Sequence, residues 1–65
     1  MISALDIYRA AHMLLERNGA EATLEAVKMI DAMLERGDIE GRAVWLRIKQ
    51  AISDIEARQP SGSVH

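Results

Sequence analysis

Two glycine turns divide this chain into three short segments, and this division limits the possible folds more than any other feature. The first turn is Asn18–Gly19 and the second is Gly37–Asp38. Glycine and asparagine tolerate the left-handed conformation in which helices often end. We therefore predict a helix exit at each turn, with one short helix in each segment.

Apolar residues recur at the three-to-four spacing of a helix face in all three segments. The spacing predicts helices at about 4–17, 20–36 and 39–58. Ser3 followed by Asp6 resembles a capping box, and Asp38 is a suitable N-cap for the third helix. The predicted core face contains Ala4, Ile7, Tyr8, Ala11, Leu14, Leu15, Thr23, Ala26, Val27, Ile30, Met33, Leu34, Gly41, Val44, Trp45, Ile48, Ala51, Ile52 and Ile55.

The expected fold is all-α. Three helices joined by very short turns predict a compact three-helix up-down-up bundle. Residues 1–58 would form this single domain. Pro60 stops the third helix, and the polar residues around it predict a disordered tail over 59–65.

The small size of the chain favours association with another chain. A domain of 65 residues buries only a modest core and gains from disulfides, a metal or a partner. Cysteine is absent, which excludes disulfides and thiolate metal sites. We therefore expect a homo-oligomer, most simply a homodimer, or a complex with an unidentified protein partner.

Several apolar residues lie at or beyond the edges of the core stripes, and they are the candidates for an interface. Trp45 has two interpretations, as a large core side chain or as an interface residue, and both hold if it lies near a dimer seam. The predicted interface residues are Met13, Leu24, Met29, Trp45 and Leu46.

A nucleic-acid-associated regulator is the alternative function. Arg42, Arg47 and Lys49 fall on the third helix, but Glu40, Asp54 and Glu56 share it. Eight basic residues against ten acidic ones give a net charge of −2, whereas phosphate contacts favour a basic surface. Nucleic-acid binding is therefore not the expected function.

Catalytic, cofactor and metal sites are not predicted. His12 and Glu16 stand one turn apart, but two ligands do not make a zinc site. Gly37 and Gly41 fit no phosphate-binding loop. An enzyme would need a pocket that encloses His12 or Tyr8 beside a carboxylate.

The expected location is the cytoplasm. The opening residues, MISALD, lack the basic start and apolar centre of a signal peptide. No apolar run approaches the roughly 18 residues that a membrane span needs.

The segments DIYRAAHMLLERNG and AMLERGDIEGRAVWLRIKQAI resemble a family of short, uncharacterised bacterial proteins that form a domain of unknown function. The resemblance extends from Asp6 to Ile55 and implies a helical fold, but no catalytic residue, cofactor or substrate. The residues that carry it are Asp6, Ile7, Tyr8, Gly37, Asp38, Gly41, Trp45, Ile48, Ala51 and Ile52.

Overall fold

Three α-helices make up the part of the chain that the structure describes, which confirms the predicted all-α fold. The computed structural model describes residues 2–58, so the predicted tail over 59–65 lies outside the described residues. The elements are α1 (Ala4–Asn18), a single 3₁₀ turn η1 (Gly19–Glu21), α2 (Ala22–Arg36) and α3 (Ile39–Ala57). The only notable difference from the predicted boundaries is η1, which occupies the start of the predicted second helix.

The predicted caps begin two of the helices. Ser3 Oγ accepts a hydrogen bond from the Asp6 amide at 3.2 Å at the start of α1. Asp38 Oδ1 accepts one from the Gly41 amide at 2.8 Å at the start of α3. Each bond satisfies an amide that has no partner within its helix, and this fixes where the helix begins.

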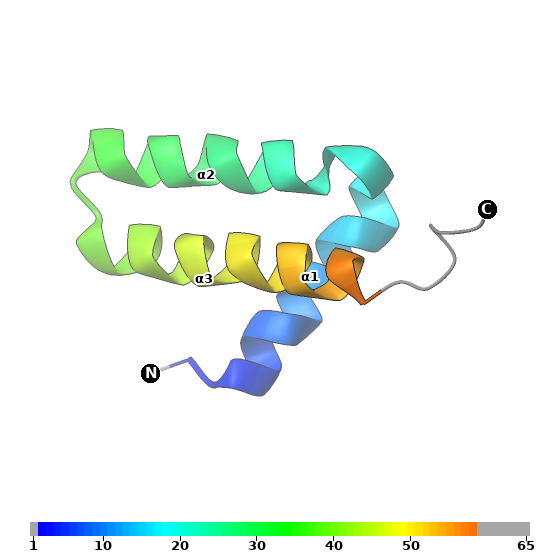
Figure 1. Cartoon of the computed structure of the whole chain (residues 1–65). Helices are drawn as coiled ribbons and strands as arrows, with labels where there is room; N and C mark the ends of the chain where they lie inside the picture. Colours follow the sequence, from blue (N-terminus) through cyan, green and yellow to red (C-terminus); the bar gives the residue numbers. More distant parts are fainter. Residues whose placement is uncertain (1, 59–65) are drawn as a thin grey trace.

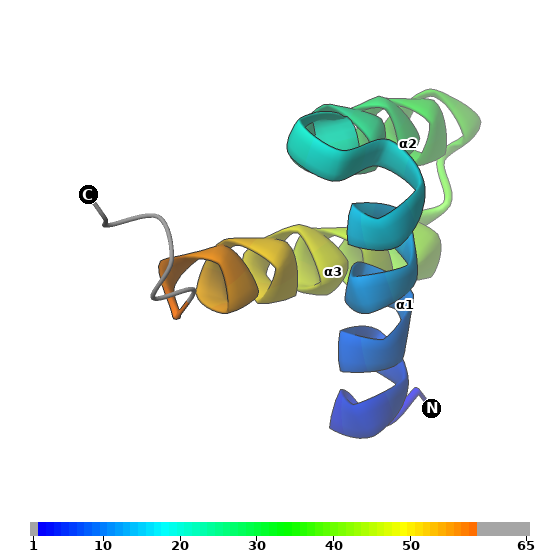
Figure 2. The same ribbon diagram turned by 90° about the vertical axis from the view of Figure 1, so that its right-hand side faces the viewer.

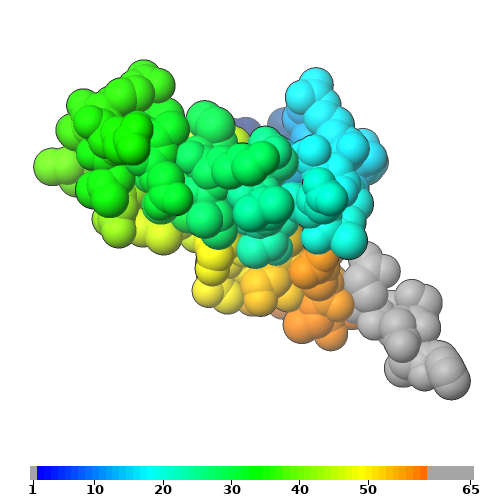
Figure 3. Space-filling model, turned by 90° about the horizontal axis from the view of Figure 1, so that it is seen from above, coloured from blue at the N-terminus to red at the C-terminus, as the bar shows by residue number. Residues whose placement is uncertain are grey.

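α2 and α3 run in opposite directions and lie side by side as an antiparallel hairpin (Figure 1). In contrast, α1 is steeply inclined to the hairpin and crosses α3 (Figure 2). Seen from above, α2 lies over α3, which emerges along one side of it, and the end of α1 lies beside the start of α2 (Figure 3). One side of the hairpin therefore receives α1, and the other side has no third helix.

The core is thin. Among the described residues the buried apolar side chains are Ile7, Ala11, Ala22, Ala26, Ile30, Met33, Ile48, Ala51 and Ile52. Four of these are alanines, which allow close helix approach but bury little area. Within residues 2–58, Ile52 of α3 is the only large side chain that is completely enclosed.

The apolar stripe of α2 is rotated from its predicted position. Leu34 was predicted in the core, but 61% of its surface is exposed, whereas Ala22 is fully buried. Ala22 and Ala26 pack in a cluster with Ile7 and Ala11 of α1. Leu34 is about 120° from Ala22 around the helix, so it points away from that cluster.

The close contact at Gly41 predicts an unusual mutational effect. A Cβ atom there would lie 2.6 Å from Asp38 Oδ2 and 2.8 Å from Met33 Sδ. Helix propensity alone predicts that Gly41→Ala stabilises the protein by about 1 kcal/mol. We expect instead a loss of about 1–2 kcal/mol in unfolding free energy, because the cap and Met33 must move. Urea unfolding followed by circular dichroism measures this change.

A double-mutant cycle with Asp38→Ala separates the contributions. Removing the capping carboxylate relieves part of the clash, so Gly41→Ala should cost less in that background. A Gly41→Ala variant as stable as the original protein would contradict the close approach of α2 and α3 at this level.

Candidate functional site

The predicted interface residues lie on separate parts of the surface. Met13 and Trp45 line one hollow between α1 and α3, with a volume of about 180 Å³. Met29 is half-buried on α2. Leu24 and Leu46 are exposed and line neither side of that hollow. The structure thus brings Met13 and Trp45 together and leaves Leu24 and Leu46 elsewhere.

Trp45 combines both predicted roles. It is half-buried and packs against the core cluster, as a core side chain does. It also forms a wall of the hollow, opposite Ala10 and Met13 of α1. Its ring therefore joins the interior to the surface between α1 and α3.

A second apolar surface lies on the hairpin, on the side away from α1. It consists of Val27, Leu34, Ile39 and Leu46, which we call the outer hairpin face. Ile39 is 81% exposed and Leu46 is 41% exposed. None of the four belongs to the core cluster or to the apolar residues packed against it.

Helix geometry gives each of the two helices one stripe of this face. Val27 and Leu34 are seven residues apart on α2, as are Ile39 and Leu46 on α3, so each pair forms one stripe along its helix. On α3, Leu46 is about 160° around the helix from the buried Ile48. Seven-residue spacing was the sequence signal that could have identified this surface.

Tyr8 and Asp54 form a polar contact between α1 and α3. Tyr8 Oη donates to Asp54 Oδ2 at 3.4 Å, and Gln50 Nε2 donates to Asp54 Oδ1 at 3.1 Å. The three side chains and Arg47 line an open hollow of about 190 Å³. A tyrosine does stand beside a carboxylate here, but the site is shallow, and both carboxylate oxygens already accept hydrogen bonds. We interpret the contact as a link that fixes α1 on α3.

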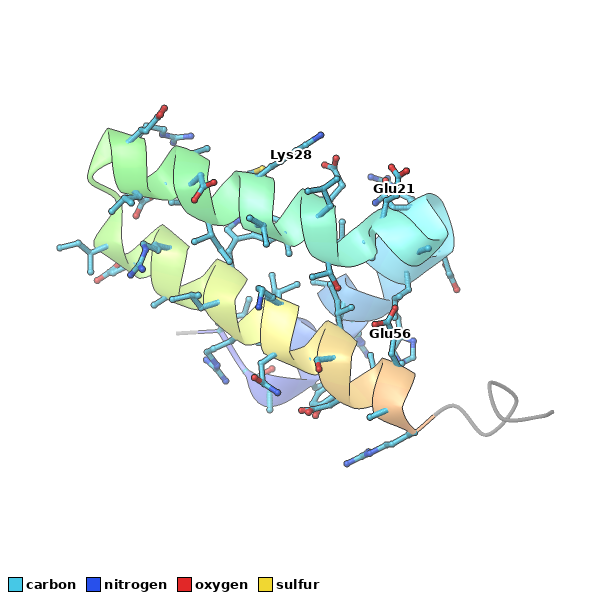
Figure 4. The ribbon with its side chains drawn as sticks, turned by 45° about the horizontal axis from the view of Figure 1, so that its top comes forward. Glu21, Lys28 and Glu56 are labelled. Atoms are coloured by element: carbon cyan, nitrogen blue, oxygen red, sulfur yellow. The ribbon has the colours of Figure 1, made fainter. Side chains whose placement is uncertain are left out.

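His12 lines a different hollow, together with Glu16 of α1 and Glu56 of α3. Figure 4 shows Glu56 near the carboxyl end of α3. Lys28 does not line this hollow and points outward from α2 in the same view. Within residues 2–58, no three potential metal ligands come close enough to hold an ion.

The basic residues of α3 do not form a single face. Arg42 and Lys49 are seven residues apart and share one side of the helix. Arg47 lies roughly 140° from Arg42 around the helix and lines the hollow beside Tyr8. A continuous strip for a phosphate backbone would need these three charges on one side.

Comparisons with protein families, with curated proteins and with solved structures found no match to the chain. The resemblance to short bacterial proteins therefore stays a prediction from the residues named for it. None of the helices over residues 2–58 has the length and apolar character needed to cross a membrane.

Proposed function

We propose that this protein is a self-associating module that acts through protein–protein contacts. The observation that carries the proposal is the thin core beside an uncovered apolar surface. Ile52 is the only large side chain that the described part of the chain encloses completely, whereas Leu34 and Ile39 remain mostly exposed. A small domain without disulfides gains stability when a partner covers such residues.

The gain from association is large compared with the stability of a domain this small. Full burial of a leucine or isoleucine side chain contributes roughly 1.5–3 kcal/mol relative to exposure. The net stability of folded proteins is only about 5–15 kcal/mol. Covering even two of the exposed side chains would therefore change the stability substantially.

Charge placement supports protein contact over the nucleic-acid alternative. Arg47 is separated from Arg42 and Lys49 around α3, and the chain carries a net charge of −2. The proposed location is the cytoplasm, and the proposed assembly is a homodimer.

Sedimentation and light scattering across a wide concentration range test the proposal. We expect the mean molar mass to rise from one chain to two as the concentration increases. We also expect the thermal midpoint to rise with concentration, because association stabilises the folded form by mass action. A constant single-chain mass with a constant midpoint would exclude self-association.

A further inference from the structure

We propose that the outer hairpin face binds a second copy of this chain, with α2 of each copy lying over α3 of the other. This inference rests on the proposed function and specifies its surface and its partner. A two-fold axis parallel to the hairpin helices generates the arrangement. Such an interface is isologous, so the face must be complementary to itself.

The two stripes of the face have matching composition and spacing. On α2, Asp31 lies between Val27 and Leu34, one turn from each. On α3, Arg42 lies between Ile39 and Leu46 in the same way. Each stripe is thus an apolar residue, a charge and an apolar residue, and the two charges have opposite sign.

The stripes are also level with each other along the hairpin. The short distance between Gly41 and Met33 shows which turns of the antiparallel helices are adjacent. Counting outward from this contact, Leu34, Asp31 and Val27 lie within one residue, about 1.5 Å, of the levels of Ile39, Arg42 and Leu46. A two-fold axis along the helices preserves these levels. The axis therefore places each residue of the α2 stripe opposite the α3 residue of the second copy that lies at the same level.

The charges of the two stripes are available for this pairing. Among the described residues the one ion pair within the chain joins Lys28 to Glu25, at 3.4 Å. Asp31 of one copy would meet Arg42 of the second copy, and the symmetry makes this contact twice. The other face-to-face two-fold arrangement stacks α3 on α3 and brings their basic residues together, which is unfavourable.

The dimensions of the face set the size of the interface that a second copy can form. A helix of 15 residues, the length of α2, is about 22 Å long. Two helices packed 8–10 Å apart present a surface about 20 Å wide. The flat footprint of about 440 Å² is roughly half of the 800 Å² per partner of a standard interface, which corresponds to a small, weak dimer interface.

Charge reversal with mixing tests the pairing. We expect Asp31→Arg and Arg42→Asp each to weaken self-association roughly tenfold, because two attractive contacts become repulsive. An equimolar mixture of the two variants should associate as a heterodimer with the original affinity, since both contacts are restored. Within each variant chain, positions 31 and 42 carry charges of the same sign, and mixing does not change this. Recovery of association on mixing therefore reports contacts between the two copies.

A matched pair of leucine variants provides the second test. Leu34→Asp places a charge on the outer hairpin face, whereas Leu5→Asp does so on α1 with comparable exposure, 61% against 60%. Leu34→Asp should abolish association, and Leu5→Asp should leave it within about twofold, with circular dichroism confirming helicity in both.

The outcomes separate this inference from the proposed function. A monomeric original protein would exclude self-association altogether. The original protein could instead be a dimer whose affinity neither falls in the two charge variants nor recovers when they are mixed. This outcome would exclude the outer hairpin face as the interface but not self-association itself. Loss of association in Leu5→Asp alone would assign the interface to α1.

Discussion

Replacing Ile52 with alanine is expected to lower the unfolding free energy by about 3–4 kcal/mol. Ile52 has 0% of its surface exposed and is the one large side chain completely enclosed by the described helices. Its neighbours in the cluster include Ala22, Ala26 and Ala51, which are too short to fill the cavity. A domain of this size has little stability to spare, so much of the population should unfold at 25 °C.

Leu5→Ala is the matched control. Leu5 is 60% exposed on α1 and lies outside the outer hairpin face. Its truncation should change the unfolding free energy by no more than about 0.5 kcal/mol. Thermal and urea unfolding, at one fixed protein concentration, compare the two variants. Equal stability of the Ile52→Ala and Leu5→Ala proteins would contradict the described core.

The two turn glycines should respond differently to substitution, although their sequence contexts look alike. Gly37 adopts φ 72° and ψ 20°, the left-handed conformation that asparagine also tolerates. Gly19 adopts φ 55° and ψ −126°, a region that other residues rarely enter. We expect Gly19→Asn to cost about 2 kcal/mol and Gly37→Asn less than about 1 kcal/mol.

Side-chain clashes do not complicate this comparison. A Cβ atom at either glycine would have no atom outside its immediate surroundings within 4 Å. The difference therefore measures backbone conformation alone, and urea unfolding of the two variants determines it. Equal costs would show that the turn after α1 does not hold the conformation described.

The helices were predictable because their signals are local. Apolar spacing, the caps Ser3 and Asp38 and the turn at Gly37 each act within a few residues. The conformation of Gly19 was not predicted, because Asn18–Gly19 is equally compatible with a left-handed exit. The structure keeps Asn18 in the right-handed region and inserts η1 before α2.

The surfaces were less predictable because they depend on where α1 lies. The sequence of α2 has a wide apolar stripe, from Ala22 around to Val27 and Leu34. Periodicity does not determine which edge of such a stripe a neighbouring helix covers. Because α1 packs beside Ala22, the side chain of Leu34 is exposed at the surface. Of the predicted interface residues, only Leu46 belongs to the outer hairpin face.

The contact between Tyr8 and Asp54 has a consequence for the order in which the chain folds. The two side chains are 46 residues apart, whereas α2 and α3 are joined by a short turn. Closing a short loop takes less conformational entropy than closing a long one, so the hairpin can form first. During synthesis α1 is made before α3, the helix that it crosses. Of these three helices, the one that is made first is therefore the last to pack.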